Sequence, residues 1–129
     1  MADEIKVSSS LTYSNGTSGA LGSLMISSRS QSITQNTAAP ARAGGTQTIG
    51  FAAHEVLVVT GITTLGWARF RNRDATNYVE IGVDVAATFY PLVGLNFGEE
   101  CVFRLSQGIT VYAQANAAAV ILDRDILDD

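Results

Sequence analysis

The second half of the chain shows a regular alternation of apolar and polar positions. In the segment Tyr78–Val85, the apolar residues Val79, Ile81, Val83 and Val85 are separated by polar or small residues. Successive side chains of a β-strand point to opposite faces. The segment therefore predicts a strand with its four valine and isoleucine side chains on the core side.

Other segments after Phe51 have the same character. Cys101, Phe103 and Leu105 form a predicted inward row, and Val102 and Arg104 point the other way. The other predicted strands are His54–Thr60, expected to be buried on both faces; Leu65–Asn72; Thr88–Val93, with Pro91 at an edge or bulge; a strand that contains Ile109, Val111 and Ala113 and follows a two-residue hairpin turn at Gln107-Gly108; and Ala119–Leu127.

The first half is polar and rich in small residues. Ile5, Val7, Leu11 and Tyr13 keep a period of two that Ser9 interrupts, which favours an opening strand. A second strand is predicted to begin at Leu24-Met25-Ile26. The segment Ala38–Gly45, which contains Pro40 and the pair Gly44-Gly45, is predicted to be a loop. This composition leaves open whether residues 1–50 form an extended arm or the first strands of the same domain.

The pattern adds up to about eight or nine short strands separated by turn residues, which is typical of a sandwich or barrel. No segment sustains the helical period, and Ala113–Val120 is too short for an unsupported helix. We predict an all-β fold: an antiparallel, jelly-roll-like β-sandwich over residues 1–129. Its main sandwich spans residues 51–129, after a polar extended N-terminal segment.

Composition adds constraints on partners. The 129 residues are 47% hydrophobic and only 16% charged, and the net charge is −4. A net negative charge predicts no nucleic-acid partner. The basic residues are seven Arg and the single Lys6, and Arg is the cation favoured at protein interfaces. The low charge content favours a surface that is partly buried in an assembly.

Compartment follows from similar arguments. No apolar run approaches the roughly 18 residues of a membrane span, so we expect no membrane partner. The acidic start Met1–Glu4 lacks an apolar signal core, which predicts synthesis without export. A single cysteine fits a reducing cytoplasm.

The sequence shows no catalytic or metal-binding constellation. A metal site needs several His, Cys or carboxylate ligands at defined spacing, and the chain has one His and one Cys. His54 is interpreted as a surface or interface histidine at a strand edge, and Cys101 as a small buried hydrophobe. We therefore predict a protein that is not an enzyme and that has no cofactor.

One charged row is the candidate interaction site. Arg69, Arg71 and Arg73 share a predicted strand face with Trp67. Three interpretations stay open: a subunit interface, a solvated face, or a stacking platform for nucleic acid. The acidic C-terminus supplies partners for this row, within or between subunits. The predicted interface residues are Trp67, Arg69, Arg71, Arg73, Asp123 and Asp125.

Several phrases of the sequence resemble a known group of proteins. They are Arg71 to Gly82 (RNRDATNYVEIG), Phe89 to Leu92 (FYPL), Gly98 to Leu105 (GEECVFRL) and Val111 to Asn116 (VYAQAN). Together they resemble small virion structural proteins of tailed bacteriophages, a loose group of decoration (cement), head-fibre and tail-associated β domains. The resemblance covers roughly residues 56–128, and the first 50 residues match nothing in that group.

The resemblance implies a capsid decoration protein that stabilises the shell by bridging its subunits. It implies a homotrimer, the major capsid protein as partner, synthesis in the host bacterial cytoplasm and a final location on the capsid surface of the virion. A tail, neck or fibre-base component is an alternative. Another alternative is a carbohydrate- or receptor-binding sandwich, with exposed aromatic residues as its stacking surface: Tyr13, Trp67, Tyr78, Tyr90 and Tyr112.

The charged row generates a first prediction. If Arg71 meets an acidic group of a second subunit, then Arg71→Glu replaces an attraction with a repulsion and weakens self-association. Native mass spectrometry of the purified protein measures the oligomer mass. An oligomer mass unchanged by the substitution would contradict the assignment.

Overall fold

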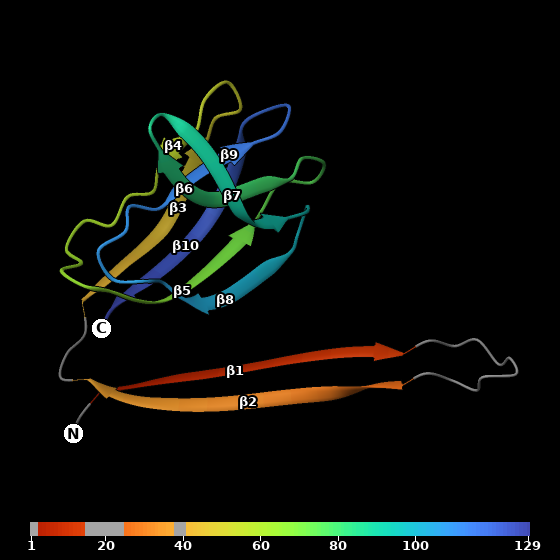
Figure 1. Cartoon of the computed structure of the whole chain (residues 1–129), viewed down its shortest axis with the longest axis vertical. Coiled ribbons are helices and arrows are strands. Elements are labelled where there is room, and N and C mark those ends of the chain that lie inside the picture. The colour runs from red at the N-terminus through yellow and green to blue at the C-terminus, as the bar shows by residue number, and fades with distance from the viewer. Residues whose placement is uncertain (1–2, 15–24, 38–40) are drawn as a thin grey trace, which may run out of the picture. The chain divides into compact units, whose positions relative to one another are not determined.

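The computed structural model describes the backbone of residues 3–14, 25–37 and 41–129. Within the first 40 residues it describes only the side chains of residues 5–8. The described residues form ten strands and no helix (Figure 1). They divide into two compact units, Met1–Ala39 and Pro40–Asp129. The predicted all-β class is confirmed.

The first unit is a two-stranded antiparallel sheet of β1 (Asp3–Ser14) and β2 (Met25–Thr37). The pairing is irregular between Leu11 and Tyr13. Ile5 is 7% exposed, whereas Lys6 and Ser8 are exposed. The alternation predicted for the opening strand is thus confirmed where side chains are described.

The start of the second strand is also confirmed. β2 begins at Met25, one residue after the predicted start at Leu24, which lies outside the described residues.

The second unit is a sandwich of two four-stranded antiparallel sheets (Figure 1). The first sheet has the order β3 (Arg42–Ile49), β10 (Val120–Asp128), β5 (Leu65–Asn72) and β8 (Glu100–Arg104). The second has the order β4 (Glu55–Val56), β9 (Tyr112–Ala115), β6 (Val79–Val85) and β7 (Thr88–Leu95). The sandwich is confirmed; its jelly-roll character is not.

The core lies between these two sheets and is made of aliphatic side chains around one buried ring. Burying such side chains supplies the main favourable free energy of folding. The largest fully buried apolar side chains are Phe70, Ile49, Leu57, Leu122, Ile126, Val79 and Val120. The inward row of Cys101, Phe103 and Leu105 packs against this core, as predicted.

The alternation in β6 holds only over its first part. Val79 and Ile81 are buried, but Val83 is half-buried and Val85 is 58% exposed. The reason is the extent of the neighbouring strand, because β9 pairs with β6 only from Val79 to Gly82. Beyond Gly82 β6 extends past the end of its paired neighbour, and Val85 is its last residue, so the prediction that Val85 faces the core was wrong.

Strand β7 carries the predicted irregularity at Pro91. It lies at an edge of its sheet, and its register with β6 shifts between Ile81 and Gly82, opposite Pro91. A β-carbon on Gly82 would lie 2.0 Å from the carbonyl oxygen of Tyr90. Glycine is therefore needed at this position for the two backbones to approach. β7 runs two residues further than predicted, to Leu95.

Two predictions about the chain before β5 were wrong. Only Glu55-Val56 of the segment His54–Thr60 pairs as a strand, and both residues are exposed, whereas Leu57 is 2% exposed. The side-chain amide of Gln47 holds this segment instead: Nε2 donates to the Val56 carbonyl at 3.0 Å, and Oε1 accepts from the Val58 amide at 3.0 Å.

The prediction of a loop over Ala38–Gly45 was also wrong. Residues 42–45 belong to β3, where they pair with the last residues of β10, and residues 38–40 lie outside the described residues. The glycine pair misled the prediction because glycine is also found in strands where other groups approach closely: a β-carbon on Gly44 would lie 2.9 Å from the side chains of Arg42 and Asp125.

Gln107-Gly108 does form a turn, but not a hairpin. The strand before the turn, β8, belongs to the first sheet, and the strand after it, β9, belongs to the second. The turn therefore carries the chain across the sandwich. The segment Ala113–Val120 contains the last three residues of β9 and the first residue of β10, and no helix.

The loop between β5 and β6 is fixed by one buried amide. Asn72 is fully buried, and its Nδ2 donates to the carbonyl oxygens of Asn77 at 2.8 Å and Leu95 at 3.1 Å. Its Oδ1 accepts from the Asp74 amide at 2.9 Å. Asn72 thus ties the end of β5 to the loop and to the end of β7.

Asp74 continues this arrangement within the loop. Its Oδ1 accepts hydrogen bonds from the amides of Asn77 at 2.6 Å and Thr76 at 2.7 Å. These bonds stabilise the ionised form, so the pKa of the Asp74 carboxyl lies below its ordinary value. The phrase Arg71 to Gly82 is therefore a hydrogen-bonded loop followed by a core strand.

We predict that Asn72→Ala lowers the free energy of unfolding by about 2–3 kcal/mol, because the carbonyls of Asn77 and Leu95 and the amide of Asp74 lose their partner. Denaturant unfolding of the full chain measures the change. The matched control is Asn116→Ala at an exposed position, for which we expect less than about 0.5 kcal/mol. A loss at Asn72 no larger than the loss at Asn116 would contradict this role.

Candidate functional site

The structure brings the predicted interface residues together on the outer face of the first sheet, here called the charged face. In the register, Asp125 of β10 lies opposite Arg69 of β5, and Asp123 lies opposite Arg71. Trp67 lies two residues before Arg69 on the same strand. Arg73 follows β5, and its amide donates to the Ile121 carbonyl at 2.9 Å.

The acidic C-terminal residues pair with this row within the chain. Asp125 is the centre: its Oδ1 accepts from Arg42 Nε at 2.9 Å, and its Oδ2 accepts from Arg69 Nη2 at 3.2 Å. Arg69 Nη1 also donates to Glu100 Oε2 at 3.0 Å. Arg42, Asp125, Arg69 and Glu100 thus form one network across all four strands of the sheet.

This network changes the titration of its central carboxylate. Partial burial acts to raise the pKa of the Asp125 carboxyl, but hydrogen bonds from Arg42 and Arg69 outweigh it, so the pKa lies below its ordinary value. The pKa of the Arg69 guanidinium is correspondingly raised, chiefly by its hydrogen bond to Asp125. Asp125 is therefore ionised throughout the neutral range.

Arg71 differs from its neighbours on the charged face. Arg73 Nε lies 3.7 Å from Asp123 Oδ2, and Arg104 pairs with Asp129. Arg71 is exposed, and no carboxylate among the described residues forms an ion pair with it. It is the member of the predicted row that is available to an external acidic group.

A second cluster lies on the other sheet, around His54. Its Nε2 lies 2.5 Å from Asp84 Oδ2, and its ring stacks on Phe89 with centroids 5.4 Å apart. The ring of Tyr112 meets it edge-on at 5.3 Å. The histidine predicted at a strand edge is thus half-buried, and it fastens the segment before β4 to β6, β7 and β9.

Asp84 also supports the turn between β6 and β7. Its Oδ1 accepts from the Ala87 amide at 3.1 Å. Ala86 and Ala87 both have positive φ, 53° and 66°, a conformation that costs a non-glycine residue roughly 1–2 kcal/mol. One carboxylate therefore holds a strained turn with one oxygen and the His54 ring with the other.

Cys101 lies beside Phe103 on the inner side of β8 and is half-buried. Burial raises the pKa of its thiol to about 11. The thiolate is the reactive form of cysteine, so the side chain is an unreactive, apolar group near neutral pH. This agrees with its predicted role as a small hydrophobe.

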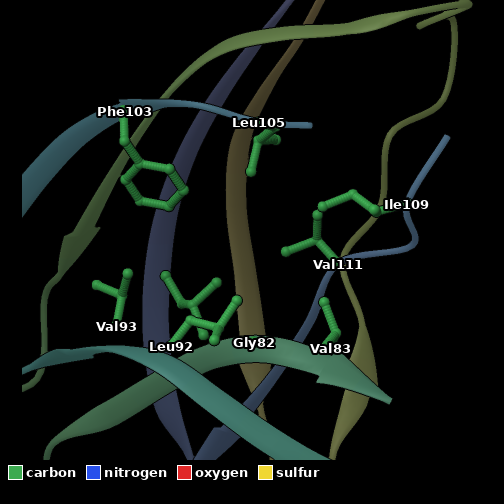
Figure 2. A pocket seen from close by; sticks show the side chains of 9 residues that line it. Gly82, Val83, Leu92, Val93, Phe103, Leu105, Ile109 and Val111 are labelled. Carbon is green, nitrogen blue, oxygen red and sulfur yellow. The ribbon is translucent and has the colours of Figure 1, made fainter. Parts of the chain in front are cut away.

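An apolar cavity of about 40 Å³ lies at the end of the sandwich that β9 leaves uncovered. Figure 2 shows Phe103 and Leu105 facing Leu92 and Val93 across it, with Ile109 and Val111 at one side. A more open groove of about 380 Å³ shares the lining residues Val83 and Ile109 with it and adds Asp84, Val85, Thr110 and Tyr112.

Large apolar side chains surround this end of the sandwich. Leu92 is 73% exposed, and Val85 and Tyr90 are each more than half exposed. Apolar residues that gather at one place on a surface mark an interaction site more often than isolated ones do.

The aromatic residues suggested for sugar stacking do not share one surface. Trp67 lies on the charged face of the first sheet, and Tyr112 packs against His54 on the second sheet. Tyr90 lies in β7 opposite Val83. The side chain of Tyr13 lies outside the described residues.

Over the described ranges, no group of His, Cys, Asp and Glu side chains is arranged to hold a metal ion. No helix there has the length and apolar character needed to cross a bilayer. No protein-family model, curated protein or solved structure matches this chain.

Sequence reasoning did not identify His54–Asp84, Gln47 or Asn72 as structural contacts. Gln47 and Asn72 bond to backbone groups of other segments, 9 and 23 residues further along the chain, which no local pattern reveals. The alternation in β6 does place Asp84 on the outward side, where His54 meets it.

The network on the charged face predicts a defined pH dependence. The pKa of Asp125 is lowered in the folded chain, so its ionised form contributes stability above its unfolded value of about 3.9. That contribution is lost as the pH falls through the folded pKa. Asp125→Asn should lower stability at pH 7 by about 1 kcal/mol, and the difference from wild type should shrink below about pH 4.

Thermal unfolding from pH 7 to pH 2.5 measures this dependence. Glu80→Gln is the control, since Glu80 lies on the second sheet and outside the network. A difference between wild type and Asp125→Asn that stays constant over this range would disprove the role of the ionised carboxylate.

Proposed function

We propose that the protein is a non-catalytic structural component of a tailed-phage virion that decorates the capsid and stabilises it by bridging shell subunits as a homotrimer. The resemblance over roughly residues 56–128 suggests the class of protein. The observation that carries the proposal is the separate two-stranded sheet of the first unit.

This sheet is incomplete as a folded element. β1 and β2 have 12 and 13 residues and pair with each other, and no third strand joins them among the described residues. A two-stranded sheet on its own is marginally stable in water, because independent stability needs three or more strands or packing against a further element. Its length and its alternation fit an extended arm that is stabilised by another protein surface. We call the pair β1–β2 the arm.

The sandwich supports docking in a different way. Its core is complete over most of the two sheets, which makes it a rigid body. Leu92, Val85 and Tyr90 of β6 and β7 remain exposed, and Arg71 on the charged face forms no ion pair with a carboxylate of the described residues. Apolar groups supply binding free energy, and a charge selects the partner.

A protein built in this way stabilises a shell by mass action. It binds the assembled shell and not its separated subunits, so it lowers the free energy of the assembled state by an amount that grows with the logarithm of its free concentration relative to Kd. Bridging needs two kinds of contact on each protomer, one to its own copies and one to the shell. The arm and the sandwich supply separate surfaces for these two contacts. The major capsid protein is the proposed shell partner.

The proposal predicts the behaviour of isolated shells. Shells purified without this protein should assemble normally but open at a lower temperature, and adding the full chain back should raise the opening temperature by several degrees. Ile5→Ser should fail to restore stability, because it removes the buried apolar side chain of the arm. Light scattering during heating measures shell opening.

The control is Ser8→Ala, which changes an exposed side chain on the same strand and should restore shells as wild type does. Shells whose opening temperature is insensitive to the wild-type chain would rule out a decoration role. Stable heads that lack infectivity would indicate a tail or neck component instead.

A further inference from the structure

A single cation lies among the core residues of the first sheet. Arg124 is in the middle of β10, where it alternates with the buried residues Leu122 and Ile126, and it is only 9% exposed. Its neighbours in the register are Phe70 of β5 and Gly45 of β3. The strand period therefore directs this guanidinium to the inner side of the sheet, unlike Asp123 and Asp125 beside it.

Arg124 has no anionic partner in the described part of the chain. Its Nε–H is buried and donates no hydrogen bond there. By contrast, Arg42, Arg69, Arg73 and Arg104 each pair with a carboxylate. The arginine side chain is a cation, and a largely buried cation without a paired carboxylate destabilises the fold.

The strand next to Arg124 leaves a free place beside it. Gly45 has φ of +119°, is exposed, and would place an added β-carbon more than 4 Å from any other group. Its strand, β3, is at the edge of the sheet, so its other side pairs with no described strand. Gly45, the residue opposite Arg124 in the register, thus has no side chain and lies on the edge strand of the sheet.

We propose that Arg124 is the cation of a recessed carboxylate-binding site that opens at Gly45 on the free edge of β3. The planar guanidinium presents parallel N–H donors that match the two oxygens of a carboxylate. The missing side chain at Gly45 gives a carboxylate room to approach, and the partly buried surroundings strengthen the pair relative to one in water. This site is independent of the proposed function.

Two sources supply the same chemistry. One is a free carboxylate anion, and the other is an acidic side chain of a second copy that lies along the open edge of β3. An acidic side chain on an added strand would also satisfy the free backbone groups of that edge. Both sources require the guanidinium of Arg124, so substitutions at this residue test the site in either case.

The experiment uses the full chain labelled with ¹⁵N, in which the Arg124 Nε–H signal is followed by NMR. In the first arm, acetate or citrate is added to dilute protein, with sodium chloride at the same ionic strength as reference. In the second arm, the protein concentration is raised without added carboxylate. If the natural ligand is a free carboxylate, we expect the Arg124 signal to shift and saturate as acetate or citrate is added. If it is an acidic side chain of a second copy, we expect that shift as the protein concentration is raised.

Thermal unfolding with and without carboxylate compares the variants. Arg124→Met should unfold at a higher temperature than wild type without anion, because a buried charge is gone, and should lose at least about tenfold in carboxylate affinity. Arg124→Lys keeps the positive charge but lacks the planar pair of N–H donors, so carboxylate should raise its unfolding temperature less than that of wild type. Arg104→Met removes an exposed arginine of β8, which is not a neighbour of β10 in the sheet, and should respond to carboxylate as wild type does.

Two results would overturn the proposal. One is an Arg124 signal that moves in neither arm. The other is an equal gain of unfolding temperature in wild type and Arg124→Met, because that gain would be a general effect of the salt on the protein surface.

Discussion

The antiparallel pairing of β10 with β3 on one side and β5 on the other is the interaction on which the sandwich depends. It joins the beginning, middle and end of the second unit in one sheet. The alternation of β10 places its side chains on two surfaces. Leu122 and Ile126 lie in the core, and Asp123 and Asp125 lie on the charged face.

The same constraint explains the exceptional position of Arg124. In an extended strand, a residue between two outward-facing acids must face inward. The sequence Asp123-Arg124-Asp125 therefore does not form a local ion-pair cluster: the two acids pair with arginines of other strands, and Arg124 is left in the core layer. A shift of one residue in register would reverse every side chain of β10, so the buried charge is fixed by the residues that hold the strand in place.

The parts of the fold that sequence reasoning predicted correctly are those in which one strand reveals its own environment. β5 matches its predicted range, and the predicted interface residues do share one face, because a period of two is a local property. Partners across the sheets are not local. The turn at Gln107-Gly108 has the residues of a hairpin, yet its flanking strands join different sheets. The alternation of Arg124 with Leu122 and Ile126 does indicate its inward position, but this segment was interpreted only as the acidic C-terminus.

Natural chains satisfy most local rules, and departures from them concentrate where a protein does something besides folding. Here the departures fall on separate elements. In the described part of the chain, the first unit has two strands where an independently stable sheet needs three, the β6–β7 end leaves Leu92 and Val85 exposed, and Arg124 of β10 has no paired carboxylate. A protein that binds one ligand needs only one surface that departs from these rules. A protein that bridges neighbours needs several, because each contact must be made by a different surface, and this distribution is the physical reason to favour an assembly role over a single binding pocket.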